Sequence, residues 1–223
     1  MVTSPRVLPA WVSQVTLYVQ EIDDAAATIP LPPAWQLAPG DRQSHFRAGR
    51  YCAQLAIERL GVPGVMPGVD EHGRPTWPSG TVGSITHALE LVSAAAAPRR
   101  RCAGLGIDVE PIVSLEKAHG WAARCATSNE VFGVMDAAMV DYATAVMLIV
   151  SAKHTLYKAL YPQVGRSIGY LDASIDDVRP SLGRFRARLK VSLSPTWVGG
   201  TMVTGQYEIA GDFIHTGIAL AAT

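Results

Sequence analysis

The pattern of apolar and polar positions predicts an alternation of strands and helices along the chain. Residues 10–22 are rich in β-branched and aromatic side chains, which predicts a strand. A proline-rich connection over 27–40 then leads to a long helix over 41–60. Asp41 is suited to cap the start of this helix, and the sequence Gly61-Val62-Pro63 is suited to end it.

The next segment predicts a loop followed by two strands. Residues 61–83 are rich in glycine and proline and predict a loop, with a short strand or hairpin at 74–77. The apolar stretches 89–97 and 102–110 flank a basic turn and predict an antiparallel pair of strands. The four alanines at 94–97 would, taken alone, also suit a helix.

The second part of the chain predicts helices and then more strands. Residues 114–140 have a mainly helical pattern, and 141–161 predict one long helix that ends at Pro162. Strands are predicted at 168–175, 183–193, 197–209 and 213–221. This order of elements favours an α+β protein made of two comparable halves, 1–110 and 111–223.

Composition narrows the classes of function. The 223 residues include 48% hydrophobic ones, enough for a buried core. Lysine plus arginine equals aspartate plus glutamate at 19 each, so neither nucleic-acid nor membrane binding is expected. The three cysteines have no zinc or disulfide spacing, which favours a reducing, cytoplasmic setting. No signal peptide is evident, and the longest apolar run, at 143–150, is too short to span a bilayer.

Two carboxylates in the predicted strand 102–110 are the first candidates for chemistry. Asp108 and Glu110 are two apart, so they point to the same face of a strand. Such a pair offers the hard oxygen ligands that Mg²⁺ favours. The alternative is a solvated strand face, although the apolar neighbours of the pair favour a core strand.

A second cluster lies on the predicted helix 141–161. His154 and Lys158 are four apart and share a helical face, while Lys153 lies one step around the helix. Two cations near a histidine would suit a phosphate anion. An ordinary amphipathic helix with solvated lysines is the alternative interpretation.

Scattered basic residues complete the candidate set. Arg42 and Arg50 are two turns apart on one predicted helix, and Arg74 follows a glycine in a loop. His87 closes a run that begins Gly83-Ser84, where small residues permit close approach of an anion to the backbone. Each residue alone would more often be an ordinary surface or structural residue. A hydrolase based on the serine is disfavoured because the run lacks the nucleophile-elbow pattern.

Taken in order, these motifs resemble one family. They are RxxxFxxGRYCA at 42–53, GRPTWP at 73–78, GSITH at 83–87, GIDVEP at 106–111 and SAKHTLYKAL at 151–160. The chain is similar to the 4′-phosphopantetheinyl transferases of the class that activates nonribosomal peptide and polyketide synthases. The order of five motifs is far more specific than any one of them.

The resemblance implies two similar α/β halves, a pseudo-dimer in one chain, with coenzyme A bound between them. It implies transfer of 4′-phosphopantetheine from coenzyme A to a serine of an apo acyl or peptidyl carrier protein, which leaves adenosine 3′,5′-bisphosphate. The reaction would need Mg²⁺, or Mn²⁺ in its place. We expect a cytoplasmic monomer that binds neither nucleic acid nor membrane.

The resemblance also implies roles for individual residues. The expected metal ligands are Asp108, Glu110 and His154, and the expected catalytic residues are His154, Lys158 and Glu110. The residues expected to bind coenzyme A are Arg42, Arg50, Arg74, Ser84, Thr86, His87, Lys153 and Lys158.

One position departs from the family pattern in a way that concerns mechanism. His154 stands where the family normally has a glutamate that ligates the metal or activates the serine. An imidazole can ligate a metal, although it suits Zn²⁺ or Ni²⁺ better than Mg²⁺, and it can act as a general base. Beside two lysines and a metal we expect its proton affinity to fall.

Several functions therefore stay open. The serine proton could pass to His154, to a metal-bound water or to Glu110. A weakly active or inactive homologue that still binds coenzyme A is one alternative to an active transferase. A non-catalytic coenzyme A sensor and a different Mg²⁺-dependent nucleotide enzyme are others.

Overall fold

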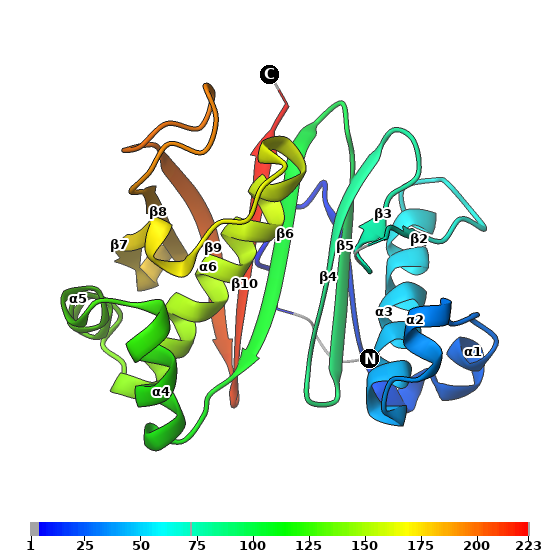
Figure 1. Cartoon of the computed structure of the whole chain (residues 1–223), viewed down its shortest axis with the longest axis horizontal. Helices are drawn as coiled ribbons and strands as arrows, with labels where there is room; N and C mark the ends of the chain where they lie inside the picture. Colours follow the sequence, from blue (N-terminus) through cyan, green and yellow to red (C-terminus); the bar gives the residue numbers. More distant parts are fainter. Residues whose placement is uncertain (1–4, 72, 223) are drawn as a thin grey trace. The chain divides into compact units, whose positions relative to one another are not determined.

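The computed structural model describes residues 5–71 and 73–222 and divides the chain into two compact units (Figure 1). The first unit holds Pro9–Leu105 and the last residues from Leu220 onward. The second unit holds Gly106–Ala219 and also Pro5–Leu8. The boundary between the units in the sequence therefore lies between residues 105 and 106, five residues before the predicted division. In addition, a short segment near each end of the chain belongs to the unit formed mainly by the other half of the sequence. The assignment of two similar halves stays a prediction.

The first unit is a three-stranded antiparallel sheet packed on one long helix. Its strands are β1 (Ser13–Tyr18), β4 (Thr81–Ala88) and β5 (Leu91–Pro98), in the order β1-β5-β4. The helix α3 (Gly40–Glu58) confirms the predicted helix and buries Cys52, Ala56 and Ile57 against the sheet. Gly49 on α3 allows close packing, because a Cβ there would lie 2.9 Å from Ile85 of β4.

Short elements connect this core. They are η1 (Val19–Glu21), α1 (Asp23–Ala27), α2 (Pro33–Gln36), β2 (Gly68–Val69) and β3 (Pro75–Thr76). The strands β2 and β3 pair with each other, which confirms the predicted hairpin near 74–77.

The predicted pairing of 89–97 with 102–110 is wrong. Strand β5 pairs with β1 and β4, whereas β6 (Cys102–Pro111) belongs to another sheet, where its neighbour is β10. Residues 91–97 are buried on both faces of β5, as expected for a central strand with a neighbour on each edge. Both edges of β5 are therefore already paired, and β6 cannot pair with it. The alanines at 94–97 form part of that strand and not a helix.

The second unit contains a five-stranded sheet in the order β6-β10-β9-β8-β7. The strands after β6 are β7 (Ala173–Arg179), β8 (Arg184–Leu189), β9 (Met202–Ala210) and β10 (Phe213–Ala221). The four predicted strands are thus confirmed, with shifted bounds. The pairing of β7 with β8 shifts register between Ile175 and Asp177. The two sheets and the helices confirm the α+β class.

Three helices of the second unit lie between β6 and β7 in sequence. They are α4 (Leu115–Cys125), α5 (Ser128–Ala138) and α6 (Tyr142–Val164), and the short turns η2 (Tyr170–Asp172) and η3 (Pro180–Leu182) follow. Asp141 caps α6 by accepting a hydrogen bond from the amide of Thr144. Helix α6 continues past Pro162, where we predicted its end, and stops at Gly165, whose φ is 66°.

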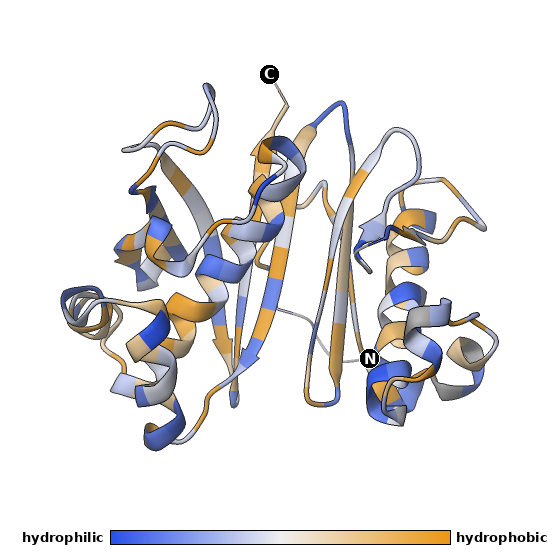
Figure 2. Cartoon of the chain, in the orientation of Figure 1, coloured by the Kyte–Doolittle hydropathy of each residue, from blue (hydrophilic) through white to orange (hydrophobic). Residues whose placement is uncertain are grey.

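The middle of α6 is almost wholly buried, from Thr144 to Lys153. Among the described residues no single helix is long and apolar enough to cross a membrane, although α5 and α6 together meet that criterion as a pair bent by 107°. Figure 2 shows the hydrophobic colour of β6 broken by hydrophilic positions toward its carboxyl end. That end of β6 contains Asp108 and Glu110.

Candidate metal and transfer site

Helix α6 is held unusually close to β6, and a glycine makes this possible. A Cβ on Gly106 would lie 2.1 Å from the backbone oxygen of Thr155, so only glycine fits there. Hydroxyl groups fix the same helix to the neighbouring strand β10. Thr216 lies 2.8 Å from the Ser151 hydroxyl and 2.6 Å from the Thr155 hydroxyl, and all three are buried. These contacts set the position of the next side chains along α6.

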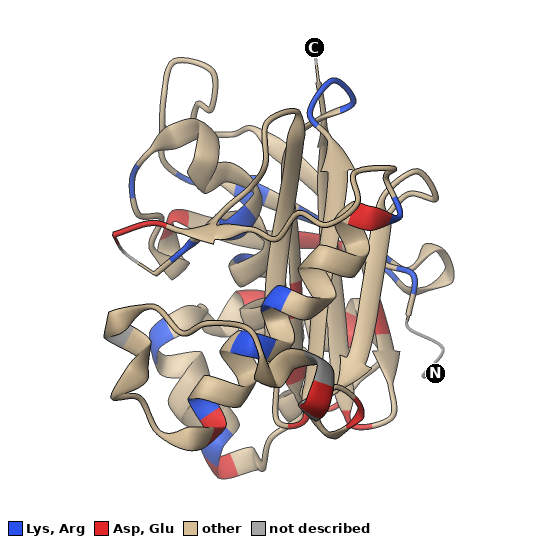
Figure 3. Ribbon diagram, turned by 90° about the vertical axis from the view of Figure 1, so that its right-hand side faces the viewer, with Lys and Arg blue, Asp and Glu red and all other residues tan. Residues whose placement is uncertain are grey.

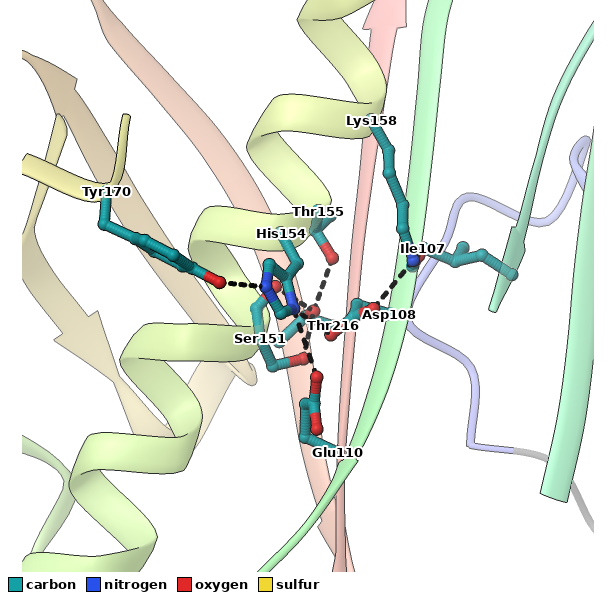
Figure 4. A network of polar contacts seen from close by, with 9 residues as sticks. All are labelled: Ile107, Asp108, Glu110, Ser151, His154, Thr155, Lys158, Tyr170 and Thr216. Atoms are coloured by element: carbon teal, nitrogen blue, oxygen red, sulfur yellow. Dashed lines mark hydrogen bonds and ion pairs between the residues drawn. The ribbon is translucent and has the colours of Figure 1, made fainter. Parts of the chain in front are cut away.

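The two predicted carboxylates face α6, as the period of the strand requires. Asp108 and Glu110 share the face of Gly106, which packs on that helix. His154 of α6 turns toward them, with Nδ1 3.1 Å from Glu110 Oε1 and 3.4 Å from Asp108 Oδ2 (Figure 4). One ligand atom from each of the three residues lies within 4.8 Å of the other two. The structure therefore brings together the three predicted metal ligands.

Lys158 joins the same group one turn further along α6. Its ammonium donates to Asp108 Oδ1 at 2.7 Å and to the carbonyl oxygen of Ile107 at 3.0 Å. Burial alone would raise the pKa of Asp108, but the charge of Lys158 and the hydrogen bond from His154 outweigh it and lower that pKa. Asp108 is thus an ionised carboxylate that is only 5% exposed.

The two carboxylates set the direction of the pKa shift of His154. Burial lowers its pKa, but hydrogen bonds and charge from Asp108 and Glu110 outweigh burial and raise the pKa to about 9. The fall in proton affinity that we expected was for a ring beside two lysines and a bound metal, and for that state it stays a prediction. The pKa of His154 rises because both carboxylates contact its ring. The two lysines do not offset this effect, because the ammonium of Lys158 is paired with Asp108 and that of Lys153 with Glu130.

Two aromatic residues surround the His154 ring. Nε2 makes a short hydrogen bond with the hydroxyl of Tyr170, on the side of the ring away from the carboxylates (Figure 4). Trp121 of α4 meets the ring edge-on, with centroids 6.4 Å apart. Burial, followed by nearby negative charge, raises the pKa of Tyr170 to about 12, so its phenol stays protonated. The ring of His154 is therefore held on both of its nitrogen atoms.

The donor set suits a divalent cation. Two carboxylates and an imidazole converge, and Asp108 is held ionised inside the protein. Carboxylate oxygens serve Mg²⁺ and Mn²⁺ alike, and imidazole serves the transition metals. Lys158 lies beside this set and would attract an anion bound to the cation.

Lys153 does not join this group. Its ammonium donates to the carboxylate of Glu130 at 2.9 Å and to the carbonyl oxygen of Cys125 at 2.8 Å, in an ion pair whose partners are 3% and 4% exposed. The second oxygen of Glu130 accepts from the amide of Ile175, where strand β7 shifts register. Lys153 thus ties α6 to α5, and the structure does not place it for the phosphate contact that we predicted.

The predicted anion ligands of the first unit separate into two groups. Arg50 is 4% exposed, its guanidinium lies over Phe46, and its Nε has no hydrogen-bond partner among the described residues. Burial lowers the pKa of Arg50 to about 10, against the opposing charge of Asp70. Arg74 binds the same Asp70 through its Nε at 2.7 Å. Asp70 is therefore paired directly with Arg74, and its charge also acts on Arg50.

The residues of the GSITH motif lie on opposite faces of β4. His87 is exposed and stacks on His45 of α3, with ring centroids 4.7 Å apart. Ser84 and Thr86 are buried on the other face, so their side chains do not line one site with His87. Arg42 is exposed near the start of α3, along which basic positions recur (Figure 3).

Sequence reasoning missed three residues that shape the site. Tyr170 of η2 contacts His154, and Glu130 of α5 contacts Lys153. Thr216 of β10 contacts Ser151 and Thr155 on the helix that carries both of those residues. No motif or spacing marks them, because their contacts join segments far apart in the chain. A capping signal does place Glu130 at the start of a helix, since its amide donates to Thr127, but it gives no sign of the buried ion pair.

A cavity of about 280 Å³ opens on the other side of His154. Its lining is mostly apolar and comes from α6 and the segment that follows it. The lining residues include His154, Leu156, Tyr157, Ile168, Tyr170 and Ala173. The cavity would accept a slender chain that is partly apolar.

Comparison with known proteins decides the family. The chain is 34% identical to the 4′-phosphopantetheinyl transferase Npt of Nocardia iowensis, over 81% of this chain and 83% of that protein. It is 30% identical to the 4′-phosphopantetheinyl transferase PptT of Mycobacterium tuberculosis over 96% of both chains. The chain belongs to the 4′-phosphopantetheinyl transferase family. It is therefore a transferase, as the ordered motifs indicated.

Two further comparisons agree with this assignment. The family model of the 4′-phosphopantetheinyl transferase N-terminal domain matches residues 33–97, all within the first unit. The enterobactin synthase component D of Salmonella typhimurium is 33% identical over 55% of this transferase and 50% of that protein. The candidate metal ligands of the second unit lie beyond the residues that the family model matches.

Proposed function

We propose that this transferase moves 4′-phosphopantetheine from coenzyme A to a serine of an apo acyl or peptidyl carrier protein. The serine oxygen forms a bond to the β-phosphorus of coenzyme A, and the bond from that phosphorus to adenosine 3′,5′-bisphosphate breaks. The observation that carries the proposal is the convergence of Asp108, Glu110 and His154 beside Lys158. Relatives that cover most of the chain bear the name of this activity.

A divalent cation, Mg²⁺ or Mn²⁺, is part of the proposal. Asp108, Glu110 and His154 would hold it, because they form a compact set of oxygen and nitrogen donors. When bound, the cation supplies positive charge that neutralises the pyrophosphate.

Lys158, Glu110 and His154 are proposed to stabilise the departing phosphate and to accept the serine proton. An ammonium has three donors, and Lys158 uses two on Asp108 and Ile107, so the third can stabilise the departing phosphate. Glu110, with its side chain 20% exposed, is proposed to receive the serine proton; His154, whose pKa its carboxylate neighbours raise to about 9, could do so only after losing its own proton. Stabilisation of charge in the transition state and positioning of the reactants should account for most of the rate acceleration, as in other phosphoryl transfers.

The basic residues of the first unit are proposed to hold the phosphates of coenzyme A. Arg50 is the strongest of them, because its buried Nε has no hydrogen-bond partner among the described residues. A buried guanidinium gains most from an anion, since water does not satisfy it. Arg74, His87 and Arg42 remain proposed contacts on the strength of the motifs, and Ser84 and Thr86 could contribute only from the other face of β4.

The cavity beside His154 is proposed to receive the pantetheine arm. It begins at a residue of the metal set, where the phosphate end of the arm would be bound. Its apolar walls, such as Leu156 and Ile168, suit the methyl groups and methylenes of the arm.

The proposal is tested by incubating the purified chain with coenzyme A, Mg²⁺ or Mn²⁺, and an apo carrier protein. The carrier should gain the mass of one phosphopantetheinyl group on its serine. A serine-to-alanine carrier is the matched control and should gain nothing. Coenzyme A binding without a mass change, across carriers from fatty acid, polyketide and peptide synthesis, would instead select the inactive homologue or sensor.

A further inference from the structure

The nitrogen donor of His154 gives the metal set a property that oxygen ligands alone would not give. Its Nδ1 lies 3.1 Å and 3.4 Å from oxygens of Glu110 and Asp108. Imidazole nitrogen binds first-row transition-metal ions far better than Mg²⁺, which prefers oxygen donors and retains its waters. The two carboxylates serve both kinds of ion, so the imidazole decides between them.

The surroundings of the ring favour its use as a ligand. Nδ1 faces the carboxylates of Glu110 and Asp108 while Tyr170 contacts Nε2, so a bound cation would take the place of the proton between Nδ1 and the acids and leave the Nε2 contact unchanged. Metal-binding histidines commonly have such a partner on their other nitrogen, which fixes tautomer and orientation. Trp121 adds an edge contact that restricts rotation of the ring. The ring is thus prepared to place one nitrogen between the two acids.

The donor set separates the transition-metal ions from Mg²⁺ more clearly than it separates them from one another. The group contains no thiolate, since its members are one aspartate, one glutamate and one histidine. With three protein donors, positions remain for oxygen ligands such as phosphate. Mn²⁺ and Co²⁺ accept such mixed nitrogen and oxygen ligands, as Ni²⁺ and Zn²⁺ also do, and they are the two ions whose binding is most easily followed by spectroscopy.

We propose that the site formed by Asp108, Glu110 and His154 is selective for Mn²⁺ and Co²⁺ over Mg²⁺. The inference rests on the metal placement in the proposed function, but it concerns binding and not transfer. His154 is the selecting ligand, and Tyr170 is a positioning residue that acts through it.

The test uses the metal-free full chain without coenzyme A or carrier, at one fixed pH. Mn²⁺ binding is followed by the electron paramagnetic resonance of the free ion, Co²⁺ binding by its visible absorption, and Mg²⁺ binding by competition. We expect Mn²⁺ to bind at least about tenfold more tightly than Mg²⁺, and the Co²⁺ spectrum to show nitrogen ligation. Equal affinities for Mn²⁺ and Mg²⁺ would overturn the proposal.

Variants assign the selectivity to the residue. His154→Glu should bind Mg²⁺ more tightly than the parent and lose most of the preference for Mn²⁺, and His154→Gln should weaken Mn²⁺ more than Mg²⁺. Tyr170→Phe should weaken Mn²⁺ by about tenfold with a smaller effect on Mg²⁺. His119→Gln, on α4 with its ring tilted against that of Tyr142, is the matched control and should change neither affinity.

The outcomes separate this inference from the proposed function. A preference for Mn²⁺ that His154→Glu leaves intact would overturn the role of His154, whether or not carriers are modified. Selective Mn²⁺ binding together with no carrier modification would support the inference and count against transfer. Circular dichroism of each variant shows that it is folded before its affinities are compared.

Discussion

Lys158 and Asp108, fifty residues apart in sequence, meet in an ion pair with 2.7 Å between Nζ and Oδ1. The same ammonium donates to the carbonyl oxygen of Ile107, so Lys158 grips the backbone of β6 as well as a side chain. Asp108 is almost buried, whereas the Lys158 side chain is 29% exposed. Lys158 therefore uses two of its three ammonium donors in these contacts, and its side chain stays partly exposed.

Replacing Lys158 with glutamine should lower the rate of carrier modification by about 10²-fold or more, because one cationic donor to the departing phosphate is lost. The effect should appear in kcat more than in the KM for coenzyme A, as expected for a group that acts in the transition state. Lys117→Gln, an exposed change on α4, is the control and should retain the parental rate. A Lys158→Gln protein with parental kcat would remove Lys158 from the mechanism.

Local periodicity accounts for much of the site. A period of two along a strand puts Asp108 and Glu110 on one face, and a spacing of four along a helix puts His154 and Lys158 on one face. Both relationships hold in the structure, where all four side chains converge. The spacing within each segment therefore predicted which side chains share a face, whereas it was the order of the five motifs that predicted that the two segments belong to one site.

Long-range packing accounts for what the sequence did not reveal. Lys153 is one step around the helix from His154, and that rotation directs it to Glu130 of another helix. Strand β5 pairs with β1 on one edge and β4 on the other, and nothing in its alanine-rich sequence indicates which strands these are. Tyr170 reaches His154 from a short turn with no helical or strand pattern. Such contacts depend on how whole helices and strands pack together, and a local sequence pattern does not predict them.

The buried pair of Lys153 and Glu130 predicts a loss of stability when one partner is removed. Lys153→Met leaves a buried carboxylate without its cation, which should cost about 3 to 5 kcal/mol in the free energy of unfolding. The double variant Lys153→Met, Glu130→Gln should recover part of this loss, because no uncompensated charge remains. Urea unfolding measures both, and a stable Lys153→Met protein with weakened coenzyme A binding would restore the phosphate role.

The close approach of α6 to β6 predicts a strong effect of one methyl group. Gly106→Ala would place a Cβ against the backbone of Thr155, which cannot rotate away, so the helix must shift. We expect a loss of about 1 to 3 kcal/mol or more in the free energy of unfolding, together with weaker Mn²⁺ binding. Gly120→Ala on α4 has open space around the new carbon and should be neutral or slightly stabilising. Equal melting temperatures for the two variants would contradict the contact.

The cysteines predict low thiol reactivity in the folded protein. Cys52, Cys102 and Cys125 are free and buried. Burial raises the pKa of Cys52 to about 12, and it raises the pKa of the other two thiols as well. At pH 8 the reactive thiolate is therefore scarce in each, and iodoacetamide should label the native chain slowly and the urea-unfolded chain at all three positions. Rapid labelling of Cys52 in the native chain, located by peptide mass, would contradict its burial.

His215 of β10 predicts a loss of stability in mild acid. Burial lowers the pKa of His215 to about 4, even though the charge of Asp108 opposes that fall, and the cross-strand position opposite is Glu208. The unfolded chain gains a proton on this histidine near pH 6.5, whereas the folded chain does so only near pH 4. Above pH 6.5 His215 is neutral in both the folded and the unfolded chain, so it does not change the free energy of unfolding. As the pH falls from 6.5 toward 4 only the unfolded chain takes up the proton, and the free energy of unfolding decreases.

The loss from this one group should reach about 3 kcal/mol at pH 4, because each unit of pKa difference corresponds to about 1.4 kcal/mol. His215→Gln cannot take up a proton, so its free energy of unfolding should fall less steeply over that range. The measurement is urea unfolding of both proteins at intervals from pH 7 to pH 4, where the difference between them should grow as the pH falls. Parallel curves would mean that His215 is protonated equally in both states, and would contradict its burial as a neutral group.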